Sequence, residues 1–182
     1  MPAPFVVRFA IGVTPGKWAG VWKERMPRHH LDLQPAAHGD ALAALADGSV
    51  DMAFLRDPLD RDARHAIPLY AERQVVVAPK EHALEAAETV TLAELEEFES
   101  VPGADIPDTG WADAVQLVAA NVGVAVMPKS VARVLSRKDV VSREIADADE
   151  TGVFLVWPRD KDSDDIQTFI GIVRGRTRNS SR

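Results

Sequence analysis

Short apolar runs alternate with amphipathic segments along the whole chain. Residues 5–11 form the first apolar run, which is long enough for a buried strand, and a turn bounded by Gly12 and Gly16 follows it. In residues 17–26 the apolar positions recur at helical spacing, which predicts a helix with one buried face. Alternation of apolar and polar residues predicts a short strand over residues 31–34, and apolar runs predict strands over residues 50–55, 74–78, 122–127, 140–145 and 153–157.

Polar capping residues mark where the remaining predicted helices begin. Asp40 is expected to cap a helix that runs to Asp47, and Gly48 is expected to end it in the left-handed conformation. Thr91 and Glu94 have the spacing of a capping box, which predicts a helix to about residue 98. The other predicted caps are Asp113 for a helix to residue 120, Ser130 for one to about residue 135, and the aspartates of residues 160–164 for one over 164–173.

This alternation of strands and helices predicts an α/β fold. Alternating units of this kind form parallel sheets with helices on both faces. Ligands of such sheets bind at the carboxyl ends of the strands, where the connections diverge. The candidate site is therefore expected in the loops after the strands, which are residues 14–18, 56–58, 102–109 and 127–130.

Composition narrows the classes of function. The chain has 182 residues, a formal net charge of −7 and no cysteine. The length suits one domain or two small lobes, and the lack of cysteine excludes disulfides, thiolate metal sites and a cysteine nucleophile. An acidic chain is expected to bind DNA poorly by itself, because nucleic-acid affinity rests on cationic side chains. The first residues fit neither a signal peptide nor a membrane span, so a cytoplasmic location is expected.

Motifs for catalysis and for metal binding are incomplete. Residues 12–17 approach a phosphate-binding loop, but the glycines are one residue too close and Trp18 stands where Ser or Thr should be. The aspartates of residues 160–164 have calcium-loop spacing, yet Asp165 replaces the required glycine. The histidines lack metal-ligand spacing, and no Gly-x-Ser-x-Gly elbow occurs. We therefore expect no enzymatic activity, no cofactor and no metal.

Several segments together resemble the effector-binding domain of LysR-type transcription regulators. The sequence LAALADGSVDMAFL at residues 42–55 is similar to the family's helix, glycine and aspartate-bearing strand. Residues 67–98 resemble its apolar strand, proline, His-x-Leu and capped helix. LVAANVGVAVMPKS at residues 117–130 is similar to its helix, small-residue turn, strand and Pro-x-Ser. Residues 153–157 and the last helix resemble its returning strand and closing helix.

The resemblance covers about residues 5–175 and implies a bilobal α/β fold like that of type 2 periplasmic solute-binding proteins. It implies two Rossmann-like lobes joined by two crossover strands, at residues 74–78 and 153–157. Lobe 1 would comprise residues 1–76 with 156–182, and lobe 2 residues 77–155. It further implies a homodimer, and a small-molecule effector, often an organic acid, between the lobes. No membrane partner is expected.

The chain departs from the family pattern in three places. No winged helix-turn-helix precedes Phe5, so DNA contact is expected only through a domain that this chain lacks. The second lobe is shortened between Val101 and Ala114, where a strand and a helix that normally line the pocket are missing. Asn121 replaces a common family glycine, and the turn is expected to survive because asparagine tolerates left-handed geometry.

By family position, the loop after the first strand would meet the ligand. Thr14 and the amides of Gly16 and Lys17 would suit a carboxylate or phosphate, and Trp18 would be an aromatic wall. The alternatives are that Thr14 only caps the helix, that Lys17 is only solvated, and that Trp18 packs in the core or at a dimer contact.

A second group of ligand contacts is expected from two other loops. Arg56 follows a buried strand and would clamp an acid through two hydrogen bonds, unless it pairs with Asp57 or Asp60 instead. The residues of the shortened loop that are expected to face the ligand are Pro102, Asp105 and Thr109.

Two functions fit this pattern. The first is a regulatory domain of a LysR-family transcription regulator, in which a small and anionic metabolite shifts lobe closure or dimer geometry. The second is a stand-alone LysR-like module for protein interaction or dimerisation, without a working pocket. A catalytic function lacks a nucleophile–base pair, and solute transport would need an export signal.

Overall fold

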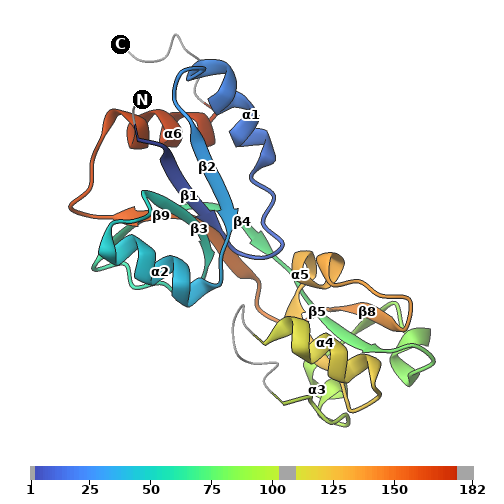
Figure 1. Ribbon diagram of the computed structural model, residues 1–182. Coiled ribbons are helices and arrows are strands. Elements are labelled where there is room, and N and C mark those ends of the chain that lie inside the picture. The colour runs from blue at the N-terminus through green and yellow to red at the C-terminus, as the bar shows by residue number, and fades with distance from the viewer. Residues whose placement is uncertain (1–2, 103–109, 176–182) are drawn as a thin grey trace. The chain divides into compact units, whose positions relative to one another are not determined.

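The computed structural model describes residues 3–102 and 110–175, which form two compact units (Figure 1). Unit 1 comprises Met1–Pro68 and Phe154–Arg182, and unit 2 comprises Leu69–Val153. The chain passes from one unit to the other inside strand β4 (Arg64–Glu72) and again inside strand β9 (Thr151–Pro158). The sequence instead predicts the first crossing in residues 74–78, with boundaries after residues 76 and 155.

Unit 1 is built on a five-stranded sheet with the order β2-β1-β3-β9-β4. Strands β1 (Phe5–Phe9), β2 (Leu31–Pro35) and β3 (Met52–Arg56) lie at three of the predicted strands. As predicted, β1 pairs in parallel with β2 and with β3. The helices of this unit are α1 (Gly16–Arg25), α2 (His38–Asp47) and α6 (Asp164–Val173).

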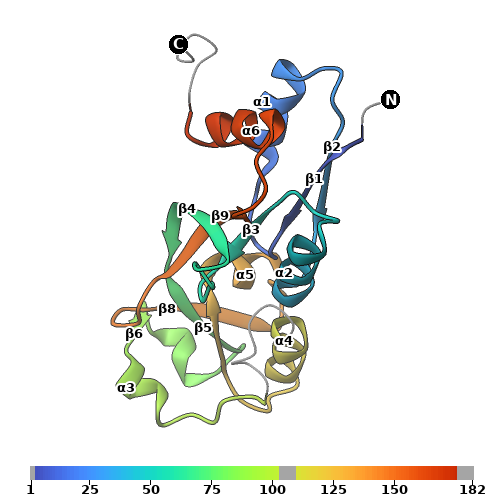
Figure 2. The ribbon, with the colours of Figure 1, turned by 90° about the vertical axis from the view of Figure 1, so that its left-hand side faces the viewer.

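Aromatic side chains fill the sheet face that α1 and α6 cover. The two helices lie side by side (Figure 1, Figure 2). The ring of Trp22 on α1 stacks on Phe5 of β1 with 4.9 Å between centroids, and Trp18 stacks on Phe54 of β3 at 4.9 Å. Phe169 of α6 contacts Phe5, Trp22 and Phe54. This aromatic cluster therefore joins both ends of the chain in one core.

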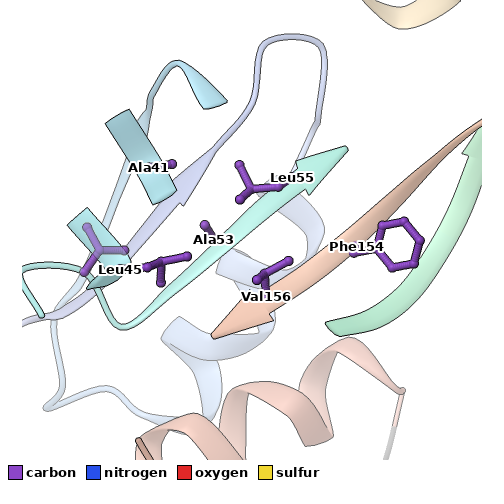
Figure 3. Close-up of a cluster of buried hydrophobic side chains, with 7 residues drawn as sticks. Ala41, Leu45, Ala53, Leu55, Phe154 and Val156 are labelled. Atoms are coloured by element: carbon purple, nitrogen blue, oxygen red, sulfur yellow. The ribbon is translucent and has the colours of Figure 1, made fainter. Parts of the chain in front are cut away.

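The opposite face of the same sheet packs against α2. Figure 3 shows Ala41 and Leu45 of α2 directed toward the strands. They meet side chains of β3 and β9, namely Ala53, Leu55, Phe154 and Val156. Since side chains alternate across a strand, β3 presents Ala53 and Leu55 to α2 and Phe54 to the aromatic cluster. The continuous apolar run of β3 thus matches a strand buried on both faces.

Unit 2 contains a four-stranded sheet with the order β6-β8-β5-β7. Its strands are β5 (Gln74–Pro79), β6 (Thr89–Val90), β7 (Ala125–Pro128) and β8 (Val140–Ile145). Strand β6 pairs in parallel with β8, but β5 runs antiparallel to both β7 and β8. The prediction of purely parallel sheets is therefore wrong for unit 2. Strands β7 and β8 lie on either side of β5 and run in the same direction as each other, and β5 runs in the opposite direction.

The remaining elements of unit 2 are short, apart from one helix. They are the 3-10 helix η1 (Ala83–Ala86) and the helices α3 (Leu92–Leu95), α4 (Trp111–Ala119) and α5 (Lys129–Val134). The predicted capping box of α3 is present, because the Thr91 hydroxyl accepts from the Glu94 amide and the Glu94 carboxylate accepts from the Thr91 amide. The helix nevertheless ends at Leu95, before the predicted limit near residue 98.

Three predicted N-caps are wrong. Ala37, Gly110 and Pro128 precede α2, α4 and α5, and none of them caps through its side chain. Asp40 and Asp113 are instead the third residues of their helices, and Ser130 is the second residue of α5. An acidic side chain in the first turn still stabilises a helix through the macrodipole. These residues therefore indicate the first turn, although they do not cap it.

Helix ends follow the prediction more closely. Gly48 ends α2 with φ 83°, and Asn121 adopts φ 60° after α4. The Asn121 amide donates to Val118 O, and the Val122 amide to Leu117 O, as in a Schellman ending. The last helix has the predicted bounds, but its cap is Ser163, whose hydroxyl accepts from the Ile166 amide at 3.2 Å, and not one of the aspartates.

Candidate functional site

The loop after β1 turns sharply before α1 begins. Gly12 adopts φ 84°, and the Val13 amide closes the turn on Ala10 O at 3.1 Å. Val13 is buried, whereas Thr14 is exposed. Pro15 precedes the first residue of α1 and no side chain caps the helix, so Thr14 does not have the capping role that was the alternative to ligand binding.

The first turn of α1 provides backbone donors and one cation. The first amides of a helix, here those of Gly16 and Lys17, have no partner within the helix. Lys17 is exposed, and its Nζ lies 4.5 Å from the centroid of the Trp18 ring. For Trp18, the alternative to a ligand contact is a position in the core, and this alternative agrees with its 8% exposure and its stacking on Phe54. A ligand contact by Trp18 remains a prediction.

Arg56 is the last residue of β3, and only 2% of it is exposed. Because β1 and β3 are parallel, with Phe9 opposite Phe54, their carboxyl ends lie at one edge of the sheet. The loop that contains Thr14 and the end of β3 that contains Arg56 therefore leave the sheet at the same edge, as the topology argument predicts.

Two acidic residues that follow Arg56 each have a partner within their own loop. Asp57 forms an ion pair with Arg61 at 3.1 Å. Asp60 Oδ1 accepts from the amides of Asp62 at 3.0 Å and Ala63 at 3.4 Å. Both carboxylates thus stabilise their own loop.

The remaining predicted contacts belong to unit 2. Val101 is buried, and its amide donates to Val124 O at 2.9 Å. Pro102 follows it and is exposed. Asp105 and Thr109 lie outside the described residues. The site loop predicted at residues 127–130 does not form. Residues 127 and 128 end β7, and α5 begins at the next residue.

Sequence reasoning missed one charged cluster in unit 2. Glu144 on β8 binds Arg73 through a hydrogen-bonded ion pair, and Lys129 Nζ lies 3.1 Å from its other carboxylate oxygen. These hydrogen bonds, first from Arg73 and then from Lys129, hold the pKa of the Glu144 carboxyl below its ordinary value. No spacing in the sequence links the three residues, because register alone brings β8 to the start of β5.

Neither a metal centre nor a membrane span is found in the described part of the chain. No three His, Asp or Glu side chains there are grouped so that they could hold a metal ion. Among the same residues, no helix combines the length and the apolar character needed to cross a bilayer.

Comparison with known proteins gives one family and many structures of the same fold. The family model described as LysR substrate binding domain matches residues 16–101 and 109–178. The match is interrupted at residues 102–108, inside the segment that the sequence predicts to be shortened. No curated protein sequence matches the chain.

Solved structures match over nearly the whole chain, at low identity. A cysteine-to-serine mutant of Corynebacterium glutamicum OxyR with bound hydrogen peroxide is 19% identical, with TM-score 0.74, and the match covers 95% of this chain and 67% of that one. The BenM effector binding domain with its effector benzoate is 18% identical, with TM-score 0.74 and coverages of 94% and 90%. Full-length CbnR complexed with its target DNA is 16% identical, with TM-score 0.71 and coverages of 93% and 69%.

These matches confirm the predicted two-lobe α/β fold and the predicted family resemblance. The chain spans about two thirds of the length of the full-length regulators that it matches.

Proposed function

Because this chain belongs to the LysR substrate binding domain family, we propose that it binds a small anionic metabolite as the effector-sensing part of a transcription regulator. The observation that carries the proposal is the convergence of Thr14, the first turn of α1 and the buried Arg56 at one edge of the unit 1 sheet. The benzoate complex of the BenM effector binding domain gives independent support, since benzoate is a carboxylate.

The proposed chemistry is recognition of a carboxylate. A guanidinium donates two parallel hydrogen bonds to a carboxylate, so Arg56 is the residue that orients the acid. The burial of Arg56 strengthens this pairing, because charges interact more strongly where water is excluded. The amides of Gly16 and Lys17 and the Thr14 hydroxyl donate to the same group. Contacts from Pro102, Asp105 and Thr109 are part of the proposal by family resemblance alone.

The proposal contains no catalytic step. The effector acts by binding two conformations of the domain with different affinity, which shifts their populations. Contact with DNA belongs to another part of a full-length regulator in this proposal, and the domain pairs with a second copy of itself. Full-length CbnR was solved with its target DNA, which is the arrangement proposed for the whole regulator.

The test is calorimetric titration with a panel of small organic acids, with benzoate as the first probe. We expect at least one acid to bind, and Arg56→Lys to weaken that binding about tenfold, since lysine keeps the charge but loses the paired hydrogen bonds. Arg61→Gln is the matched control, because Arg61 is an exposed arginine of the same unit and pairs with Asp57.

Absence of binding by every acid in the panel would contradict the sensing proposal. Capture of a second protein together with that absence would favour the alternative of an interaction module. Equal affinities of the wild type and Arg56→Lys would remove Arg56 from the site while leaving the ligand class in place.

A further inference from the structure

Unit 2 contains a cavity of about 580 Å³ that has no part in the proposed effector site. It lies between α5 with its following turn, the end of β4 with Arg73, and β8. Its lining residues are Ala71, Glu72, Arg73, Lys129, Ser130, Ala132, Arg133, Ser136 and Ser142. Three cations, three hydroxyls and one carboxylate, that of the buried Glu72, thus surround one hollow in a chain whose formal net charge is −7.

Helical spacing explains why three polar side chains of α5 and of the turn after it meet at this cavity. Lys129 and Arg133 are four residues apart, and Arg133 and Ser136 are three apart, so all three project on one side of α5 and its C-terminal turn. Ala132 on the same wall is small, as is Ala71 on β4, and two methyl groups leave the space open. The hollow is therefore a consequence of the residues at these positions.

Strand alternation explains the opposite wall. Ser142 and Glu144 are two residues apart on β8 and point to one face of the sheet. Val77 and Val75 of β5 pair with them in register. Glu144 reaches Arg73 and Lys129 from this face, at 3.1 Å in the case of Lys129. One carboxylate of the protein thus already binds two of the three cations that line the cavity.

Arg133 differs from the other two cations. Within the described residues, its guanidinium has no ion pair and no hydrogen bond, and the residue is exposed. The hydroxyls of Ser136 and Ser142 belong to exposed residues and have no hydrogen bond in the same part of the chain. A guanidinium and two hydroxyls can all donate hydrogen bonds to an oxyanion. The nearby Glu144 carboxylate already accepts from Arg73 and Lys129.

We propose that this cavity is a second ligand site, which binds the oxyanion group of a small metabolite through Arg133, Ser136 and Ser142, with Glu144 as a built-in competitor for Arg73 and Lys129. The volume lies within the range of roughly 300–1,000 Å³ that small-molecule sites occupy. Carboxylates and phosphates share the oxyanion chemistry, and the experiment separates them. The site is independent of Thr14 and Arg56, which belong to unit 1.

The test is a titration followed by amide ¹⁵N–¹H correlation spectra, with sodium acetate and inorganic phosphate as separate probes at constant ionic strength. We expect saturable shifts of the Ser130, Arg133, Ser136 and Ser142 amides with a Kd below about 10 mM for at least one probe. Arg133→Gln is expected to weaken this binding about tenfold. Glu144→Gln is expected to strengthen it several-fold, because Arg73 and Lys129 then become available to the anion.

Lys138→Gln is the matched control, since Lys138 is an exposed cation of unit 2 that does not line this cavity. It is expected to leave both affinities unchanged. Shifts with acetate alone assign a carboxylate, and shifts with phosphate alone assign a phosphate. The proposal fails if neither probe saturates at these amides, or if Arg133→Gln binds like the wild type. It also fails if Glu144→Gln, with a dispersed spectrum that shows it is folded, binds more weakly.

Discussion

Gly123 lies where two backbone segments of unit 2 come close together. The Val124 amide donates to Glu99 O at 2.9 Å, and a Cβ on Gly123 would lie deep inside contact distance of that same carbonyl oxygen. Backbone atoms cannot rotate away as a side chain does. We expect Gly123→Ala to lower the free energy of unfolding by roughly 1–3 kcal/mol, measured by urea denaturation.

Gly171→Ala is the matched control for this effect. Gly171 lies inside α6, and nothing surrounds the position of its missing Cβ. The same substitution is therefore expected to raise the free energy of unfolding by roughly 0.5–1 kcal/mol, because alanine favours a helix. Equal effects of both substitutions would contradict the close approach at Gly123.

The ion pairs of Glu144 are expected to make the free energy of unfolding depend on pH in the acidic range. Hydrogen bonds from Arg73 and Lys129 hold the pKa of its carboxyl below the ordinary value of 4.5, so its contribution to stability is complete above that value and is lost as the pH falls through the lowered pKa. We expect Glu144→Gln to be less stable than the wild type near neutral pH. The difference between their unfolding free energies is expected to shrink below pH 4.5. A difference that stays constant into acid would contradict this role.

Side chains show why the candidate site could be predicted only in part. The apolar spacing that predicts α1 also predicts a core position for Trp18, and the stacked Phe54 accounts for that position. The place of Arg56 at a strand end follows from the apolar run before it. Its 2% exposure and the pairing of Glu144 with Arg73 depend on segments distant in sequence, which no local pattern encodes.

At the scale of elements, the cap of α6 gives a direct test. The Ser163 hydroxyl accepts from the Ile166 amide at 3.2 Å, which satisfies one of the first amides of the helix. We expect Ser163→Ala to lower the free energy of unfolding by about 1 kcal/mol. Ser100→Ala, at an exposed serine, is the control and is expected to change it by less than about 0.5 kcal/mol. Thermal and urea denaturation measure both.

Elements with a strong apolar pattern could be predicted from the sequence, whereas strand β4 and the direction of strand β5 could not. Strand β4 was missed because Pro68 and charged residues interrupt it, which is typical of the edge strand that it is. The reversed direction of β5 depends on its pairing with β7 and β8, over separations of many residues. Helix starts were located to within three residues, because an acid in the first turn resembles a cap in sequence.

At the scale of the whole molecule, Phe169 holds together segments from both ends of the chain. Its ring contacts Phe5, Trp22 and Phe54, and it is 1% exposed. We expect Phe169→Ala to lower the free energy of unfolding by about 3–5 kcal/mol and to reduce the near-ultraviolet circular dichroism of the tryptophans. Leu92→Ala, at a residue that is 46% exposed, is the control and is expected to change stability by less than about 0.5 kcal/mol.

The division of unit 1 into two stretches of sequence has a consequence for synthesis on the ribosome. Strands β1 to β3 are made first, but α6 and most of β9, which lies between β3 and β4 in the sheet, are made only after Leu69–Val153. At roughly 5–20 residues per second, those 85 residues take about 4–17 s to translate. During that interval the nascent chain contains Phe5 and Trp22 without Phe169, and at its end the whole sequence of unit 2 has been made while unit 1 still lacks its second stretch. Unit 2 can therefore fold before unit 1, whose sheet is completed only by the last residues to be made.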